Sequence, residues 1–307
     1  MQFPQTEPPV SAAPVSDNTG SQVPGSSTEA KPLRDFARSF VRHRSAMIGS
    51  FLVMIFVFCA VFAPVLTPYE FHASSRETLQ FPSAAHWFGT DDLGRDIFTR
   101  VIYGARISLW VGFIAITGSI IVGSLLGLIA GYYGKWQDSL ISRIFDILLA
   151  FPGILLAIAI VAMLGPGLNN ALIAIAIINV PMFGRLMRSR VLSVKQEDFV
   201  LAAKAIGMKN SRILWKHILP NCWTPIMVQG TLGFATAVIE AAALGFLGLG
   251  AQPPQPEWGT MLSDSREFIQ LAPWTMIFPG LAIMLTVLGF NLLGDGLRDI
   301  FDPRMKQ

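Results

Sequence analysis

The chain of 307 residues is 52% hydrophobic and only 14% charged, whereas a typical soluble domain has about 25% charged residues. This composition excludes an ordinary soluble globular protein, because so few charges would not keep so much apolar surface in water. The net charge of +3 is too small to indicate nucleic-acid binding, and the two cysteines provide neither a disulfide framework nor a metal site.

Residues 1–30 are rich in Pro, Ser, Gly and Thr and have no apolar period, which predicts a disordered N-terminal tail. We do not expect a cleaved signal peptide, since the first apolar run starts near residue 46 and is too long for one. Residues 31–105 are predicted to form an amphipathic entry segment (about 32–45), the first transmembrane helix and an outer loop.

Charge-free apolar runs predict six membrane-spanning helices, since one span needs about 20 mostly apolar residues. Ala46–Leu66 and Ile107–Gly134 provide the first two spans. The run Ile147–Gly184 is too long for one helix and is interrupted by Gly-Pro-Gly at 165–167. This turn cluster predicts spans three and four, joined by a short hairpin.

The fifth predicted span runs from Pro225 to Gly250, with Thr224 as its N-cap and Pro225 as its first helical residue. The sixth runs from Trp274 to Gly296 and is followed by a tail, 298–307. Of the 23 lysines and arginines, 18 fall in segments on the same side as the N-terminus. The positive-inside rule therefore places both termini in the cytoplasm.

The cytoplasmic loop 185–224 is predicted to contain two short helices. A capping box at 193–196 opens the first, whose apolar face repeats at helical spacing and contains Phe199, Ala202, Ala203 and Ile206. Gly207 is expected to end this helix, Asn210 to cap the second, and Pro220 to end the second. The resulting shape suits insertion into a groove on a partner.

Catalytic and nucleotide-binding patterns are missing from the sequence. The only Gly-Lys pair, Gly134-Lys135, is followed by Trp136, so the chain has no G-x-x-x-x-G-K-[ST] loop to cradle phosphate. It also has no H-E-x-x-H and no G-x-S-x-G pattern. We therefore predict that the chain is not an enzyme, binds no metal and takes its energy from a partner.

The sequence of the loop resembles a known family. Leu201-Ala-Ala-Lys-Ala-Ile-Gly207, followed by His217-Ile-Leu-Pro-Asn221, is similar to the EAA loop of bacterial ABC importer permeases. In that family the loop is the coupling helix that docks onto the ATP-hydrolysing subunit. The glutamate that names the loop is Leu201 here, and its role is not transferred to Glu197, one turn earlier.

Three further segments are similar to peptide and nickel permeases of this class. They are Gly89-Thr-Asp-Asp-Leu-Gly-Arg-Asp96 with Tyr103-Gly-Ala-Arg106, Leu244–Gly250 with Gln252–Gly259, and at the C-terminus Phe290–Asp299 with Asp302–Arg304. The C-type permease of dipeptide transport systems resembles the chain most, and the similarity covers most of residues 33–304.

The resemblance implies an all-α type I ABC importer transmembrane domain over 106–297, multi-pass in the bacterial inner membrane. It implies a complex with a sister permease, two ATPases and a periplasmic solute-binding protein, in lipid and without nucleic acid. No cofactor is then bound by this chain, since ATP sits on the partners, and import of dipeptides or short oligopeptides proceeds by alternating access. The docking residues implied are Glu197, Leu201, Ala202, Ala203, Gly207, His217 and Pro220.

Glu240 lies in the middle of the fifth predicted span, where an ionised carboxylate costs several kcal/mol unless it is paired or hydrated. Two roles stay open. It either faces the translocation path and meets the ammonium end of a peptide, or it pairs with another helix and fixes packing. For Asn179 and Asn291, also within spans, we expect interhelical hydrogen bonds.

Other functions stay open as well. A nickel or other small-solute permease of the same subfamily is the alternative within transport. A secondary transporter or channel that needs no ATPase is the alternative from another class, although its usual inverted repeats are not evident here. A membrane-embedded enzyme is a third, which the missing nucleophile–base pairs disfavour.

Overall fold

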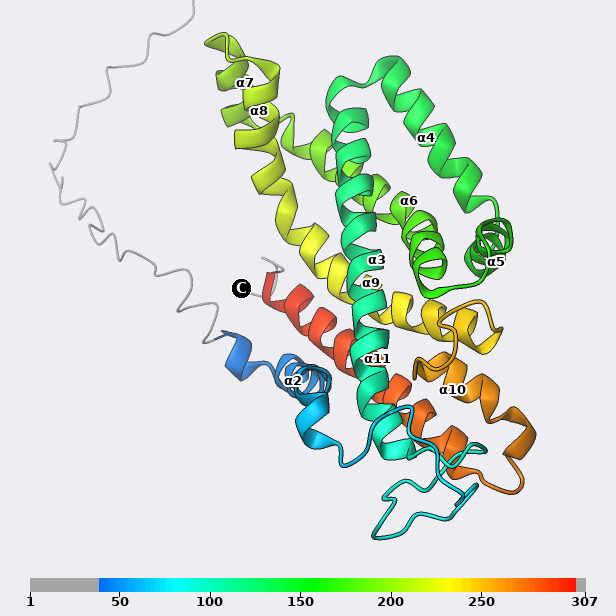
Figure 1. Ribbon diagram of the computed structural model, residues 1–307. Helices are drawn as coiled ribbons and strands as arrows, with labels where there is room; N and C mark the ends of the chain where they lie inside the picture. Colours follow the sequence, from blue (N-terminus) through cyan, green and yellow to red (C-terminus); the bar gives the residue numbers. More distant parts are fainter. Residues whose placement is uncertain (1–38, 302–307) are drawn as a thin grey trace, which may run out of the picture.

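The computed structural model describes residues 39–301, which form helices joined by loops (Figure 1). The predicted tail 1–30 and residues 302–307 lie outside the described residues, and only 39–45 of the predicted entry segment is described. The elements in chain order are α2 (Arg44–Leu66), α3 (Ile97–Tyr133), α4 (Lys135–Leu149), α5 (Gly153–Leu164), α6 (Leu168–Val194), α7 (Asp198–Ala205), α8 (Asn210–Ile213), the π-helix η1 (Leu214–Ile218), α9 (Leu219–Phe246), α10 (Trp258–Asp264), the 3-10 helix η2 (Arg266–Phe268) and α11 (Trp274–Phe301).

Within residues 39–301, five helical segments are long and apolar enough to cross a bilayer: α2, α3, α6, the run Asn210–Phe246 and α11. A sixth candidate crossing is formed by α4 and α5 together, which are bent by 92° at the break between them. The predicted all-α membrane fold is confirmed. The candidate crossings also follow the order of the six predicted spans.

The third crossing differs from the single helix predicted to begin at Ile147. Pro152 lacks an N–H and restricts the residue before it, so α4 ends at Leu149 and α5 begins at Gly153. The 12 residues of α5 extend about 18 Å, which is less than the roughly 30 Å of a hydrocarbon core. The sequence did not predict α4 as part of a span, because the charged residues in α4, which starts at Lys135, interrupt the apolar run.

The second span begins earlier than predicted, at Ile97 instead of Ile107. Asp96 is its N-cap, and one carboxylate oxygen accepts a hydrogen bond from the backbone N–H of Thr99 at 2.8 Å. Arg100 and Arg106 interrupt the apolar run before Ile107, although the sequence around Asp96 carries a recognisable cap signal.

The prediction for the start of the fifth span is wrong. Thr224 and Pro225 do not begin a helix, because Pro225 lies inside α9 and the run Asn210–Phe246 is helical throughout. Pro220 does not end a helix either, since it occupies the first turn of α9, directly after η1. The helix continues through Pro220 by way of the wider turn of η1, in which the N–H of Leu219 donates to the carbonyl oxygen of Leu214.

Close packing between α3 and α6 forms the centre of the molecule. Gly123, Gly127 and Gly131 repeat every four residues on α3, which predicts close helix packing, either inside the subunit or against a sister permease. In the structure this stripe faces α6: a Cβ at Gly123 or Gly127 would overlap the backbone oxygens of Val180 and Gly184. Small residues permit this approach in a membrane, where lipid provides no hydrophobic drive for helix association.

Replacing Gly127 with alanine is expected to destabilise the chain by about 1–3 kcal/mol, because the added methyl group has no room against backbone atoms. Gly118→Ala on the same helix is the matched control, since its Cβ would meet Ala176 Cβ at 3.8 Å, an ordinary contact. Thermal unfolding in detergent measures both variants. Equal melting temperatures for the two would contradict this account of the stripe.

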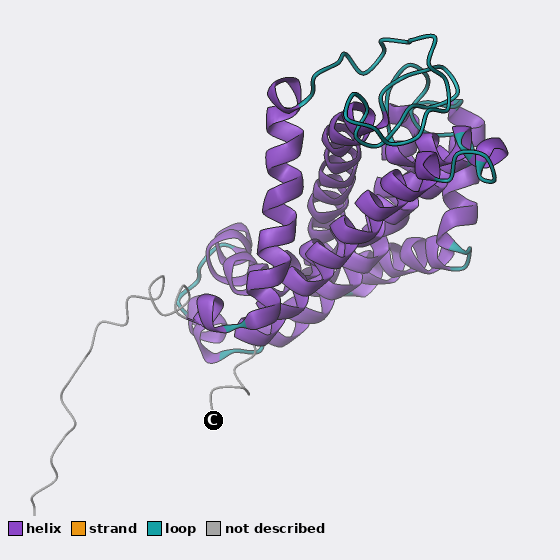
Figure 2. Ribbon diagram, turned by 90° about the horizontal axis from the view of Figure 1, so that it is seen from below, coloured by secondary structure: helices purple, strands orange, loops and turns teal. Residues whose placement is uncertain are grey.

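The beginning of α2 and the end of α11 lie together. His43 Nε2 is 3.2 Å from Asp299 Oδ2, and a Cβ at Gly296 would meet Ala46. Figure 2 shows the long loops gathered at one end of the helices. This placement agrees with two termini on the same side of the membrane.

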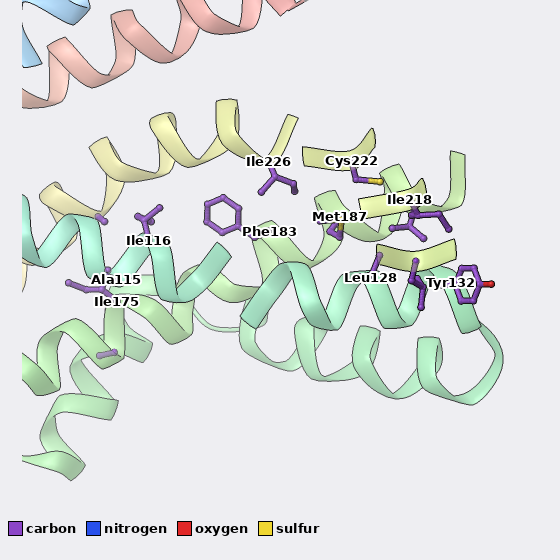
Figure 3. Close-up of a cluster of buried hydrophobic side chains, with 14 of the residues drawn as sticks. Ala115, Ile116, Leu128, Tyr132, Ile175, Phe183, Met187, Ile218, Cys222 and Ile226 are labelled. Atoms are coloured by element: carbon purple, nitrogen blue, oxygen red, sulfur yellow. The ribbon is translucent and has the colours of Figure 1, made fainter. Parts of the chain in front are cut away.

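A buried apolar cluster joins α3, α6 and the run Asn210–Phe246. Figure 3 shows its side chains meeting from these three helices, including Ile116, Phe183 and Ile226. The cluster continues to the tip of the molecule, where Tyr132 and Ile218 belong to it. The loop after α6 is therefore packed onto the same core as the membrane helices.

Candidate functional site

The loop between α6 and α9 projects at one end of α3, opposite the loop that precedes α3 (Figure 1). Its first helix, α7, ends at Ala205, and Gly207 follows with φ +77°. The N–H groups of Gly207 and Met208 donate to the carbonyl oxygens of Lys204 and Ala203. This is a Schellman ending, which requires a left-handed residue and confirms the predicted stop at Gly207.

Two other local predictions for this loop are wrong. Ser193 does not form a capping box, because it lies in the last turn of α6 and its hydroxyl donates to the carbonyl oxygen of Ser189. Asn210 does not cap α8 with its side chain, because its Oδ1 accepts a hydrogen bond from Tyr132 at 2.7 Å. A tertiary contact therefore replaces the cap at Asn210, whereas Ser193 bonds within its own helix.

The tip of the loop presents apolar side chains to its surroundings. Ile206 is 78% exposed, Leu201 is 49% exposed and Phe199 is 43% exposed. Ala202 and Gly207 are also exposed. We call the set Phe199, Leu201, Ala202, Ile206 and Gly207 the docking face.

Ala203 does not belong to the docking face, contrary to the prediction. It is only 5% exposed and packs into the central cluster together with Val200. The apolar repeat from Phe199 to Ile206 therefore divides between an inward side and an outward side. The sequence period alone does not show where this division falls.

The remaining predicted docking residues lie around this face. Glu197 is the exposed N-cap residue of α7, although its side chain forms no cap hydrogen bond. His217 is half-buried beside Phe199, with ring centroids 6.4 Å apart, and Pro220 is exposed on α9. The same segment carries four exposed basic side chains, which we call the basic rim: Lys204, Lys209, Arg212 and Lys216.

Glu240 lies on α9 and pairs with a neighbouring helix. Its Oε2 accepts a hydrogen bond from Asn179 Nδ2 of α6 at 2.8 Å, which confirms an interhelical bond for Asn179. Asn179 is 6% exposed, whereas Glu240 is half-buried. The pairing accounts for one carboxylate oxygen, and among residues 39–301 the structure gives Oε1 no hydrogen-bond partner. Both roles considered for Glu240 are compatible with this geometry.

Two ion pairs connect α4 to the cytoplasmic half of α6. Arg188 forms two hydrogen bonds to the carboxylate of Asp138, and Arg185 Nη2 lies 2.6 Å from Asp146 Oδ1. Their position at inner helix ends predicts interfacial ion pairing for Asp146, Asp295 and Arg298, and the structure confirms it for Asp146. The pair of Asp138 with Arg188 was not predicted. Both pairs connect α4, and not α5, to α6.

The outer end contains a buried charge cluster that the sequence analysis did not find. Arg95 donates to Asp91 at 2.6 Å, and Arg100 Nε lies 3.6 Å from the same carboxylate. Asp264 lies 4.0 Å from Arg95. The sequence does show Arg95 and Arg100 close to the acidic residues at 91–92, and this pattern could have indicated the cluster. Asp264 is far away in sequence, so its place beside Arg95 is seen only in the structure.

Glu257 caps α10 at this outer end, accepting hydrogen bonds from the N–H groups of Gly259 and Thr260 at 2.9 Å each. Burial raises the pKa of Glu257 to about 7, because water no longer stabilises its charge. The backbone donors act in the opposite direction but do not cancel this effect. An open pocket of about 80 Å³ lies between this helix and Arg95.

The site offers contact surfaces instead of reacting groups. The docking face is apolar with a basic rim, which suits a protein partner with an apolar groove and acidic edges. Among residues 39–301, no three His, Cys, Asp or Glu side chains lie close enough together to hold a metal ion.

Comparison with known proteins gives the family of the chain. A family described as binding-protein-dependent transport system inner membrane component matches residues 123–307. The N-terminal TM domain of oligopeptide transport permease C matches residues 31–82.

Curated relatives match over nearly their whole length. The dipeptide transport system permease protein DppC of Alkalihalophilus pseudofirmus is 64% identical over 280 residues, which cover 91% of this chain and 92% of the relative. The di/tripeptide transport system permease protein DppC of Pseudomonas aeruginosa is 47% identical over 282 residues, which cover 90% of this chain and 93% of the relative. The glutathione transport system permease protein GsiD of Pectobacterium atrosepticum is 47% identical over 277 residues, which cover 90% of this chain and 92% of the relative.

Solved structures show the same fold. A chain of the inward-facing MetNI methionine ABC transporter matches with a TM-score of 0.54 and 18% identity, covering 67% of this chain and 98% of that chain. A chain of an amino acid ABC transporter matches with a TM-score of 0.51 and 16% identity, covering 64% of this chain and 92% of that chain. The chain belongs to the family of binding-protein-dependent transport system inner membrane components, and is therefore a multi-pass transport subunit of the inner membrane.

Proposed function

We propose that this chain is the permease subunit of an ATP-driven importer that carries dipeptides or short oligopeptides across the inner membrane. Partner ATPases hydrolyse ATP, and a solute-binding protein delivers the peptide on the outer side. A sister permease completes the translocation path. The family is that of binding-protein-dependent transport, and relatives at 47% and 64% identity are named as di/tripeptide and dipeptide permeases.

The exposed docking face is the observation that carries the ATP-driven part of this proposal. A side chain such as Ile206, 78% exposed at the tip of an otherwise packed loop, has no role in the fold of the isolated chain. Apolar groups on such a tip are typical of an interface that another protein covers. Leu201 stands where the family's loop has a glutamate; this difference changes a contact within the docking face but leaves the face apolar.

The mechanism follows from how the docking face is attached. ATP-driven closure of the partner subunits moves the loop, and the buried residues Val200 and Ile213 transmit the movement to the helices around the central cluster. The helices tilt and the path alternates between its outer and inner openings. We further propose that Glu240, half-buried on α9 and bonded to Asn179 of α6, meets the ammonium end of a peptide on this path.

Copurification tests the proposal. A tagged chain, expressed with its neighbouring genes and extracted in mild detergent, should bring down two ATPases and a second permease. A chain that purifies without any ATPase would contradict the ATP-driven reading and favour a secondary transporter. Nickel, glutathione and other small solutes are the competing cargoes, which uptake measurements distinguish.

A further inference from the structure

Tyr132 connects the cytoplasmic end of α3 to the docking loop. It is 6% exposed, and its hydroxyl donates a hydrogen bond to Asn210 Oδ1, at the start of α8, over 2.7 Å. Figure 3 shows Tyr132 at one end of the central cluster, with its hydroxyl pointing away from the other labelled side chains. One side chain therefore belongs to the core and also reaches the loop.

The ring of Tyr132 also lies beside two lysines. Lys204 Nζ of α7 is 5.7 Å from the ring centroid, and Lys195 Nζ, just after α6, is 5.8 Å from it. Both distances are within the range of about 6 Å in which a cation is attracted to an aromatic face. Lys195 Nζ further donates to the backbone carbonyl of Tyr132 at 2.7 Å, where the negative end of the α3 dipole favours a cation.

These contacts differ from the apolar packing around them. Val200, Ala203 and Ile213 are buried against the same core, but apolar contacts have little directional preference. The hydrogen bond to Asn210 specifies one position of α8 relative to α3. Since α3 continues to the buried charge cluster around Asp91, a movement of its inner end also reaches the outer end.

We infer that Tyr132 is the positioning residue that ties the docking loop to α3, so that movement imposed by an ATPase is passed to this helix. The inference rests on the proposed function, because it needs a partner that pushes on the loop. It adds a specific route: from the docking face through Asn210 and the two lysines to the inner end of α3.

The test measures coupling in the complete importer, reconstituted in lipid vesicles with its binding protein and supplied with alanyl-alanine. Tyr132→Phe removes only the hydroxyl, and Asn210→Ala removes its acceptor. Tyr133→Phe is the matched control, since Tyr133 is the exposed neighbour at 45% exposure. The readout is peptide transported per ATP hydrolysed, for equal amounts of assembled complex.

Tyr132→Phe and Asn210→Ala should each lower the transport-to-ATP ratio about five-fold, the size expected for one lost hydrogen bond, while ATP hydrolysis continues. The double variant should lose no more than either single variant, because both remove the same contact. A residue that only stabilised the fold would reduce the yield of complex without changing this ratio.

Two outcomes overturn the inference, and they are distinguishable from each other. If wild-type complex contains ATPases and Tyr132→Phe transports as much peptide per ATP as Tyr133→Phe, the route through Tyr132 is wrong and the proposed function stands. If the wild-type chain assembles with no ATPase, the proposed function fails and the inference fails with it.

Discussion

Ile206→Glu should abolish most of the ATPase copurification and most of the ATP-driven uptake. Ile206 is 78% exposed at the tip of the docking face, so a charge there is hydrated in the free chain and loses its water only when a partner covers it. Truncating a central interface residue costs about 2 kcal/mol or more, equivalent to about 30-fold in affinity, and a buried unpaired charge costs at least as much.

The control for Ile206→Glu is Gln196→Glu, which adds the same charge at an exposed position outside the docking face. Both variants should show the melting temperature of the wild type, because neither side chain is packed in the core. Pull-down against a titration of purified ATPase measures the affinities. If Ile206→Glu retained wild-type ATPase binding, the docking face would be misplaced.

The second large effect is expected at Glu240. Glutamine at this position keeps an oxygen that accepts the hydrogen bond from Asn179 Nδ2 but carries no charge. Glu240→Gln should therefore raise the KM for dipeptide uptake about ten-fold, the size expected for losing a hydrogen bond to a charged group, while assembly stays intact.

Two further variants separate transport from packing at this site. Asn179→Leu removes the interhelical hydrogen bond and leaves the carboxylate, and Glu240→Leu removes both. If the carboxylate only fixes packing, the leucine variants lower the melting temperature and Glu240→Gln changes nothing. Unchanged uptake by Glu240→Gln would remove Glu240 from the translocation path.

The membrane fold could be predicted because lipid leaves few alternatives. Backbone groups in hydrocarbon must bond within helices, so charge-free apolar runs and the Gly-Pro-Gly break at 165–167 locate most crossings. α2 and the start of α11 agree closely with their apolar runs. The predicted helix boundaries were wrong where a helix continued past charged residues or prolines, as at Arg106 and Pro225.

The candidate site was predictable in outline but not in its contacts. Gly207 was recognisable as a helix stop because a left-handed residue is needed there. By contrast, Asn210 bonds to Tyr132, a residue far away in sequence, and this partnership replaced the local cap that its position suggested. Ala203 turned inward for the same reason, since the core and not the helix period decides which side is covered.

The account's central claim is that this chain moves peptides with energy from partner ATPases. The most direct measurement is uptake of radiolabelled alanyl-alanine into vesicles that contain the purified complex, with binding protein outside and ATP inside. We expect uptake that requires ATP, stops when the ATPase subunits are omitted, and is competed by unlabelled dipeptide. Equal uptake without ATPase subunits, or uptake of nickel or glutathione but not of dipeptide, would contradict the claim.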